Sequence, residues 1–303
     1  MGVLAVINRL IMSGGGLADT TAPIIELVGG NDITMAVGDV LVEPTIIVYD
    51  DTSIPRVEIV DNVNIAAEGE YKIAYTAYDE FDNVATAERN VKVVQPAGRV
   101  YLTFDDGPSD YTASLLDTLN KYGVKATFFV TGYGDDAVLK REYDEGHAVG
   151  VHTMSHVYSQ IYTNTSNYWD DFNAVQDRIR RVTGQTTALM RFPGGSSNTI
   201  SALYDGGHHI MFTLVDEAAA RGYTYFDWNV DSNDAGGAST ADEVYDNVSR
   251  ILGDGGEYVV LQHDVKPYSV EAVERIIQYG LEHNFVFSAL RENSFSAHHG
   301  VNN

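Results

Sequence analysis

The sequence predicts an α/β protein that carries a small all-β module at its N-terminal side, and three observations support this. Residues 23–94 contain short runs rich in β-branched and aromatic residues, separated by Gly, Asn and Asp pairs. After the stretch QPAG, at residues 95–98, strand-like and helix-like segments alternate up to residue 290. Polar residues follow several of the strand-like segments, which is typical of functional groups at the ends of parallel strands.

The composition excludes several classes of function. The chain has 303 residues and a formal charge of −24, from 43 acidic and 19 basic residues. Binding to nucleic acids or to an anionic membrane relies on basic patches, so we expect neither partner. The chain has no cysteine, which excludes disulfides, thiolate nucleophiles and Cys-based zinc sites. Any metal ion must therefore be held by His, Asp or Glu.

Residues 1–22 are expected to form an N-terminal segment with a Gly-rich linker at Ser13–Gly16. The apolar run at its start is interrupted by Asn8 and Arg9, and no basic residue precedes it. It is therefore either a poor signal peptide or a segment that docks the chain to a larger surface or a virion assembly. The run is too short to span a membrane, so we expect no transmembrane segment.

Residues 23–96 are expected to form a small β-sandwich. In the run YKIAYTAYD, the side chains of Tyr71, Ile73, Tyr75 and Ala77 fall on one face of an extended strand. Several short strands at this spacing are typical of sandwiches. The pattern GEY…YTAYDEFDN…A is similar to that of the immunoglobulin-like modules of bacterial surface and secreted enzymes. No set of residues in this segment predicts catalysis.

Residues 97–292 are expected to form the α/β domain, and residues 293–303 a solvated C-terminal tail. Its segments, in order, are RVYLTFDDGPS, YTASLLDTLNKYG, VKATFFVTG, DDAVLKREYDEGHAVGVHT, YWDDFNAVQDRIRRVTG, ADEVYDNVSRILGDGGEYVVLQHD and SVEAVERIIQYGLEHNFVFSAL. Because strand-like and helix-like segments alternate, a parallel sheet or barrel is expected.

Two polar groups in this domain are candidates for metal binding. Asp105 and Asp106 directly follow an apolar strand, and neighbouring carboxylates repel each other, so a buried pair favours a cation. Taken alone, the sequence Asp-Asp-Gly-Pro at residues 105–108 is also typical of a surface turn. His152 and His156 are four residues apart, which places both rings on one face if the segment is helical. One Asp with two His would make a facial triad with open positions, but the His pair needs a third ligand from elsewhere.

The segment from about residue 99 to residue 290 resembles the polysaccharide deacetylases with NodB homology, which are metal-dependent carbohydrate esterases. The resemblance rests on five motifs in order: TFDDGP, HTMSH, RFPGG, DWNVDSND and LQH. Each motif alone is weak, whereas the ordered set is specific. The resemblance implies a distorted, incomplete (β/α) barrel of NodB type.

The resemblance also implies a role for individual residues. Asp106, His152 and His156 would bind one divalent metal, with Zn²⁺ expected and Co²⁺, Mn²⁺ or Ni²⁺ as alternatives. The catalytic set would be Asp105 as general base, His263 as general acid, Arg191 holding Asp105, and Asp231 supporting His263, with Asp234 as a substitute for Asp231. The substrate-binding set would be Pro193, Gly194, Gly195, Trp228 and Leu261, with the N–H of Gly194 directed at the oxyanion.

Two positions depart from the pattern of the family. The fourth motif commonly ends in Trp, where this chain has Ala235. The third motif commonly has an aromatic residue where this chain has Gly194. Both changes are expected to remove apolar wall from the acetyl pocket and so to affect the substrate range more than the reaction.

The expected activity is removal of N-acetyl groups from an N-acetylhexosamine polymer, with the N-acetylglucosamine of peptidoglycan as the leading substrate. Alternatives with the same residues are a chitin-oligosaccharide deacetylase and an acetylxylan esterase. A non-catalytic wall-binding protein is a further alternative, which the intact motif set argues against. The expected location is extracellular or in the cell envelope, or on a virion if the chain is a phage or cell-surface structural component that modifies the wall.

Overall fold

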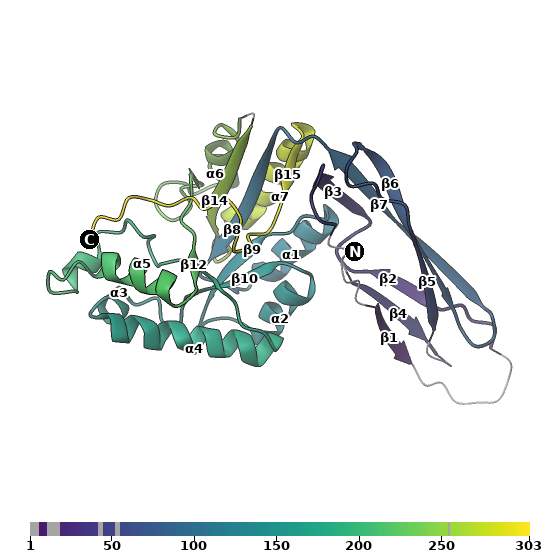
Figure 1. The fold of residues 1–303 in the computed structure, drawn as a ribbon, viewed down its shortest axis with the longest axis horizontal. Helices are drawn as coiled ribbons and strands as arrows, with labels where there is room; N and C mark the ends of the chain where they lie inside the picture. Colours follow the sequence, from purple (N-terminus) through teal and green to yellow (C-terminus); the bar gives the residue numbers. More distant parts are fainter. Residues whose placement is uncertain (1–5, 11–18, 42–44, 52–54, 254) are drawn as a thin grey trace. The chain divides into compact units, whose positions relative to one another are not determined.

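The computed structural model describes residues 6–10, 19–41, 45–51, 55–253 and 255–303. The chain divides into two compact units (Figure 1). The first comprises Met1–Pro96 with Leu119–Val124, and the second comprises Ala97–Thr118 with Lys125–Asn303.

The first unit contains two β-sheets. One has three strands in the order β1-β4-β2, and the other has four strands in the order β3-β7-β6-β5. The strand bounds are β1 Val6–Leu10, β2 Ile24–Leu27, β3 Asp32–Ala36, β4 Ile46–Asp50, β5 Arg56–Asp61, β6 Gly69–Tyr78 and β7 Val84–Val94. Buried side chains from both sheets, among them Ile46, Val48, Ile73 and Val91, form one shared core. The unit is therefore an immunoglobulin-like sandwich.

The alternation expected in residues 71–78 is confirmed in β6. Ile73, Tyr75 and Ala77 are buried, whereas Lys72 is exposed. Val6–Leu10, in the N-terminal segment, forms strand β1, which the sequence analysis did not predict; β1 pairs in parallel with β4. The predicted linker at residues 13–16 lies outside the described residues.

The second unit is built on a parallel sheet in the order β12-β11-β10-β9-β8-β14-β13, with β15 paired to β8. Its strands are β8 Gly98–Asp105, β9 Thr127–Thr131, β10 Ala148–Thr153, β11 Leu189–Met190, β12 Thr224–Tyr225, β13 Val230–Asp231, β14 Gly256–His263 and β15 Phe285–Phe287. β12 and β13 are neighbours in sequence but lie at opposite ends of this order and do not pair. The sheet is therefore a barrel that does not close, as expected.

Helices connect these strands and cover the sheet (Figure 1). They are α1 Thr112–Lys121, α2 Asp136–Asp144, α3 Tyr158–Ile161, α4 Thr165–Thr183, α5 Ile210–Ala220, α6 Ala241–Ser249 and α7 Pro267–Glu282, with a 3₁₀ turn at Ser201–Leu203. α2 and α4 pack on β10, and α7 packs on β14 and β15. Their ends follow ordinary capping rules: Asn164 caps α4, Gly184 ends it with φ 79°, and Thr240 and Glu243 form a capping box on α6.

The C-terminal residues are not a solvated tail, contrary to the expectation. Ala297 is buried in the core of the second unit. The backbone N–H of His299 donates to Asp227 Oδ2 at 2.8 Å. Asn303 is buried, and its side chain donates to Ser201 Oγ at 2.8 Å. These contacts depend on single side chains and on the backbone, so the sequence carries no periodic signal for them.

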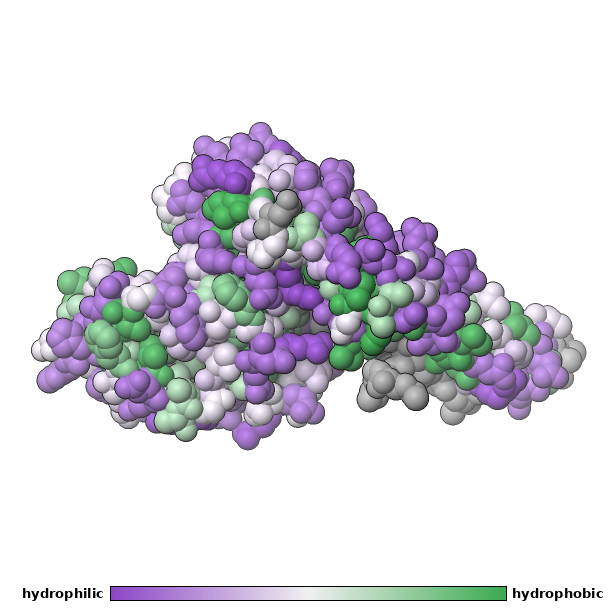
Figure 2. Space-filling model, turned by 45° about the horizontal axis from the view of Figure 1, so that its top comes forward, coloured by the Kyte–Doolittle hydropathy of each residue, from purple (hydrophilic) through white to green (hydrophobic). Residues whose placement is uncertain are grey.

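The surface that Figure 2 draws is mostly hydrophilic, and its hydrophobic residues form separate groups. Exposed apolar side chains such as Val60, Leu203 and Phe212 come from different elements. Single exposed apolar residues are normal on a folded protein. Among the described residues, no helix combines the length and the apolar character that a membrane span needs.

Candidate active site

The predicted site residues meet at the carboxyl ends of the parallel strands. Asp105 ends β8, and it is paired in register with His263, which ends β14. His152 lies near the end of β10, and Arg191 directly follows β11. Because carboxyl ends of parallel strands share one edge of a sheet, residues separated by up to 158 positions in sequence come together.

Asp106, His152 and His156 form a compact ligand cluster. Asp106 Oδ1 lies 3.5 Å from His152 Nε2 and 3.4 Å from His156 Nε2. Asp106 Oδ1 is buried and has no hydrogen-bond partner. Buried carboxylate oxygens are rarely left unpaired in folded proteins, so an orphaned oxygen facing two imidazoles indicates a cation site.

Hydrogen bonding and burial prepare His152 as a neutral ligand. Its Nδ1 lies 2.8 Å from the backbone oxygen of Arg191, so the Nδ1–H donates there and the Nε2 lone pair faces Asp106. Burial lowers the pKa of His152 below its ordinary value, against the opposing charge of Asp105. A neutral imidazole is the form that binds a metal.

His152 and His156 are not on a helix, although their spacing of four residues suggested one face of a helix. His152 belongs to β10, and His156 lies in the loop before α3 with φ 52°. Asp106 also has a left-handed backbone, with φ 76°. The backbone N–H of Ser155 donates to Asp171 Oδ1 at 3.0 Å and fixes this loop. Left-handed conformations are costly for residues with a Cβ, so the surrounding chain must hold Asp106 and His156 in them.

Arg191 holds Asp105 as the resemblance implied. Its Nη1 donates to Asp105 Oδ1 at 2.9 Å and to Thr103 Oγ1 at 2.6 Å. Its other nitrogens donate to the backbone oxygens of Phe226 and Asp227. Arg191 is fully buried and Asp105 is 3% exposed, so the ion pair is shielded from solvent. Thr103 is a member of the site that the sequence analysis missed.

The carboxylate that supports His263 is Asp234, not Asp231. Asp234 Oδ1 lies 2.7 Å from His263 Nδ1, and Asp234 Oδ2 accepts the backbone N–H of His263 at 2.7 Å. Burial alone lowers the pKa of His263, but the hydrogen bond and charge of Asp234 outweigh it and raise that pKa to about 9. Asp231 is exposed, and among the described residues its side chain accepts a hydrogen bond only from the backbone N–H of Asn233. The chain reverses at Asn233, where φ is 61°, and this turn brings Asp234 rather than Asp231 to His263.

The third motif forms a loop that is fixed by Tyr162 and lies beside Tyr158. The hydroxyl of Tyr162 donates to the backbone oxygen of Pro193 at 2.8 Å. Gly194 is exposed with φ 76°, and a Cβ built on it would lie 2.9 Å from the hydroxyl of Tyr158. The hydroxyl of Tyr158, from α3, therefore lies beside Gly194, and the expected loss of apolar pocket wall at this position stays a prediction. Two tyrosines four residues apart after HTMSH were the signal in the sequence.

Trp228 lies next to the loop of the third motif, and Leu261 lies near the carboxyl end of β14. Trp228 is half-buried, and a Cβ on Gly195 would lie 3.0 Å from its ring. Leu261 is buried on β14, on the same face as His263 two residues further along. Asp227, which the sequence analysis missed, is buried and accepts the backbone N–H of Ser196 at 2.8 Å, thereby joining the third motif to the fourth. Its place directly before Trp228 in the fourth motif was the available signal.

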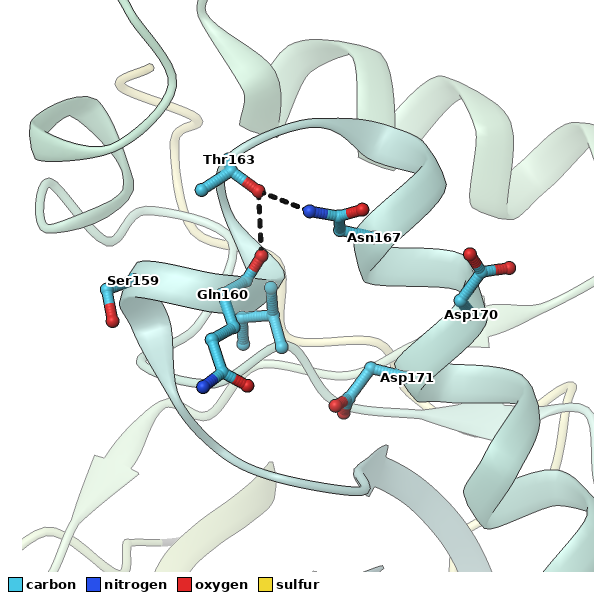
Figure 3. Close-up of a pocket in the computed structure, with 7 residues that line it drawn as sticks. Ser159, Gln160, Thr163, Asn167, Asp170 and Asp171 are labelled. Carbon is cyan, nitrogen blue, oxygen red and sulfur yellow. Dashed lines mark hydrogen bonds between the residues drawn. The ribbon is translucent and has the colours of Figure 1, made fainter.

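A hollow of about 460 Å³ lies between α3 and the start of α4 (Figure 3). Its lining includes Ser159, Asn167, Asp170 and Asp171. No member of the Asp/His cluster lines it. The hollow touches the site only through Asp171, which fixes the loop before His156.

Comparison with known families agrees with this geometry. Residues 92–206 match the family model of the polysaccharide deacetylases, and residues 25–93 match that of the immunoglobulin-like domain of bacterial surface proteins. A peptidoglycan N-acetylglucosamine deacetylase of Bacillus cereus is 35% identical over 64% of this chain and 70% of its own. A chitin deacetylase of Pestalotiopsis is 33% identical over 59% of each chain.

Solved structures give the same result. The catalytic domain of a peptidoglycan N-acetylglucosamine deacetylase from Eubacterium rectale aligns with a TM-score of 0.64 and 45% identity. The alignment covers 68% of this chain and 94% of that one. With its half-barrel sheet, its cluster of Asp106, His152 and His156 and these relatives, the chain belongs to the polysaccharide deacetylase family.

Proposed function

We propose that this protein removes the acetyl group from N-acetylglucosamine units of peptidoglycan. The proposal rests on two proton carriers at neighbouring strand ends beside one ligand cluster. Asp105 ends β8 and pairs with Arg191, and His263 ends β14 and pairs with Asp234. The relatives from Bacillus cereus and Eubacterium rectale, both described as peptidoglycan N-acetylglucosamine deacetylases, support this substrate.

Asp106, His152 and His156 would hold one divalent cation, and Zn²⁺ fits them best. Two ligand atoms at ordinary Zn–N and Zn–O lengths in a tetrahedral site lie about 3.4 Å apart. The separations of 3.5 and 3.4 Å from Asp106 Oδ1 to the two imidazole nitrogens match this value. When bound, such an ion supplies Lewis-acid polarisation of a carbonyl and lowers the pKa of a water.

In this proposal Asp105 is the general base. It lies next to Asp106 in the chain, and one of its oxygens is occupied by Arg191. The other oxygen, Oδ2, lies 3.9 Å from His152 Nε2 and faces the cluster. Arg191 fixes the orientation of the carboxylate, so Oδ2 is free to accept a proton from the attacking water.

His263 is placed to act as the general acid. Its Nδ1 is bound to Asp234, so its Nε2–H is the proton available for transfer. The water oxygen forms a bond to the carbonyl carbon, the C–N bond breaks, and the Nε2 proton passes to the leaving nitrogen. The products are acetate and a free amine on the sugar. A pKa near 9 keeps His263 protonated at neutral pH.

Two neighbouring substrates remain candidates. The identity to a chitin deacetylase favours chitin oligosaccharides as the second choice, and the same residues would also serve an acetylxylan esterase. For the location, we propose the extracellular space or the cell envelope, with the immunoglobulin-like unit as a surface module; its match to a bacterial surface domain supports this. The comparisons do not support docking to a virion.

One experiment tests the proposed function. Zn²⁺-loaded protein is incubated with peptidoglycan, chitin oligomers and acetylxylan, and the released acetate is measured. The expected result is a higher kcat/KM on peptidoglycan fragments than on the other two. Acetate release from acetylxylan alone would exclude an amide-cleaving role, and no release from any of the three would exclude deacetylation.

A further inference from the structure

Tyr158, the first residue of α3, lies between the ligand cluster and the third motif. Its ring meets the imidazole of His156 edge-on, with centroids 5.4 Å apart at 88°. Its hydroxyl lies 2.9 Å from the point where a Cβ on Gly194 would be. The hydroxyl of Tyr158 therefore lies beside the backbone of Gly194, and its ring contacts His156, one of the candidate metal ligands.

The hydroxyl of Tyr158 has no hydrogen-bond partner among the residues that the structure describes. Its neighbour Tyr162, whose ring centroid is 5.6 Å away, does have one: the backbone oxygen of Pro193, at 2.8 Å. Tyr158 is half-buried, and its hydroxyl is not among the buried unpaired atoms, so a molecule that enters the site can reach it. The hydroxyl is therefore available to a ligand that binds beside the cluster.

The direction of the N–H of Gly194 follows from the hydrogen bond that Tyr162 makes. The Pro193–Gly194 peptide is trans, because Gly107–Pro108 is the one cis bond among the described residues. In a planar trans peptide the carbonyl and the N–H point in opposite directions. Since Tyr162 binds the carbonyl of Pro193, the N–H of Gly194 points away from Tyr162, and it meets no acceptor in the described chain.

We propose that Tyr158 is a substrate-contacting residue whose hydroxyl donates a hydrogen bond to the acyl oxygen of the acetyl group, beside the N–H of Gly194. This deepens the proposed function and rests on it. It gives residue 194 a physical reason to be glycine, because any larger side chain would displace the hydroxyl of Tyr158. Two donors aimed at one oxygen stabilise the negative charge that develops there.

Acetate binding tests the proposal without depending on turnover. Affinities of Zn²⁺-loaded wild type, Tyr158→Phe and Tyr143→Phe for acetate are measured by titration calorimetry. Tyr143 is an exposed residue of α2 and serves as the matched control. A hydrogen bond to a charged oxygen is worth at least tenfold in affinity, so Tyr158→Phe should bind acetate about tenfold more weakly while Tyr143→Phe is unchanged. Equal affinities in all three proteins, at equal zinc content and melting temperature, would overturn the proposal.

Kinetics on N-acetylated oligomers give the second readout. Tyr158→Phe should lower kcat by roughly 10- to 100-fold with little change in KM, because the developing oxyanion is the state it stabilises. Gly194→Ala should cost less in the Tyr158→Phe background than in the wild type, since the contact at 2.9 Å is then removed. Strict additivity of the two changes would count against the proposal. If the wild type released no acetate from any glycan, the proposed function would fail, while the acetate affinities would still decide the role of Tyr158.

Discussion

Replacing Asp234 with Asn should shift the pH dependence of the enzyme. In the wild type, burial lowers the pKa of His263, and the bound carboxylate of Asp234 reverses this and raises it to about 9. An amide can keep one hydrogen bond to His263 but carries no charge. The pKa of His263 should therefore return to about 6.5, a change of roughly 2.5 units or about 3 kcal/mol.

The direction of the change follows from the role of His263 as acid. Activity requires its protonated form and falls as the pH rises through its pKa. At pH 8, roughly 90% of the wild-type imidazole and roughly 3% of the variant imidazole would carry the proton, so kcat/KM should drop about 30-fold. At pH 5.5 the two proteins should differ much less.

The assay is acetate release from N-acetylated oligomers between pH 5.5 and 10, with Zn²⁺ content checked at each end. The control is Asp231→Asn, which removes a carboxylate that is three residues away, exposed and bonded only to the N–H of Asn233. The Asp231→Asn variant should not change the pH at which activity falls on the basic side of the profile, the basic limb. An unmoved basic limb in Asp234→Asn, or an equal shift in Asp231→Asn, would refute the assignment of Asp234 as the partner of His263.

Two further predictions concern the site, and a third concerns Asp264, the buried residue that follows His263. Asp106→Ala and His152→Ala should each lose most of the bound metal, measured by elemental analysis, and unchanged stoichiometry in both would contradict the ligand set. His263→Ala should lose roughly 10²- to 10⁴-fold on N-acetyl substrates and far less on nitrophenyl acetate, whose leaving group needs no proton; equal losses would contradict a general acid. Burial raises the pKa of Asp264 to about 7. Between about pH 4 and pH 7 the folded protein therefore keeps a proton on Asp264 that the unfolded chain has released. The free energy of unfolding of the wild type accordingly falls as the pH rises to 7. Asp264→Asn should therefore gain about 2 kcal/mol relative to wild type between pH 5.5 and 8 in urea unfolding, and a constant difference would contradict this.

The sequence predicted the strand ends of the site well, because each motif follows an apolar run. TFDDGP, HTMSH and LQH mark the ends of β8, β10 and β14, and the parallel sheet then brings Asp105, His152 and His263 together. A strand end is readable because hydrophobic runs and Gly-Pro turns are local signals. The sheet order and the failure of β12 and β13 to pair depend on contacts between distant segments, which local patterns do not contain.

Two of the misplaced details in the site depend on single left-handed residues. The HxxxH spacing suits a helix, but the chain leaves β10 and turns at His156, where φ is 52°. The choice between Asp231 and Asp234 is decided at Asn233, where φ is 61°. Asn adopts this conformation more readily than most residues, yet its presence alone does not predict the turn. The spacing of residues in the motifs therefore predicted the right residue types, but it did not predict which of the two carboxylates, Asp231 or Asp234, contacts His263.

The left-handed residues also bear on how the ligand cluster is maintained. Asp106 and His156 both adopt conformations that are unfavourable for residues with a Cβ, so the surrounding chain must hold them. The hydroxyl of Thr131 donates to the backbone oxygen of Asp106 at 2.9 Å, and Asp171 fixes Ser155 next to His156. These contacts come from β9 and α4, outside the five motifs. The motifs thus identify the candidate ligands, but Thr131 and Asp171, which hold them in position, belong to none of the motifs. The sequence therefore predicts which residues form the cluster, whereas its geometry follows only from the folded chain.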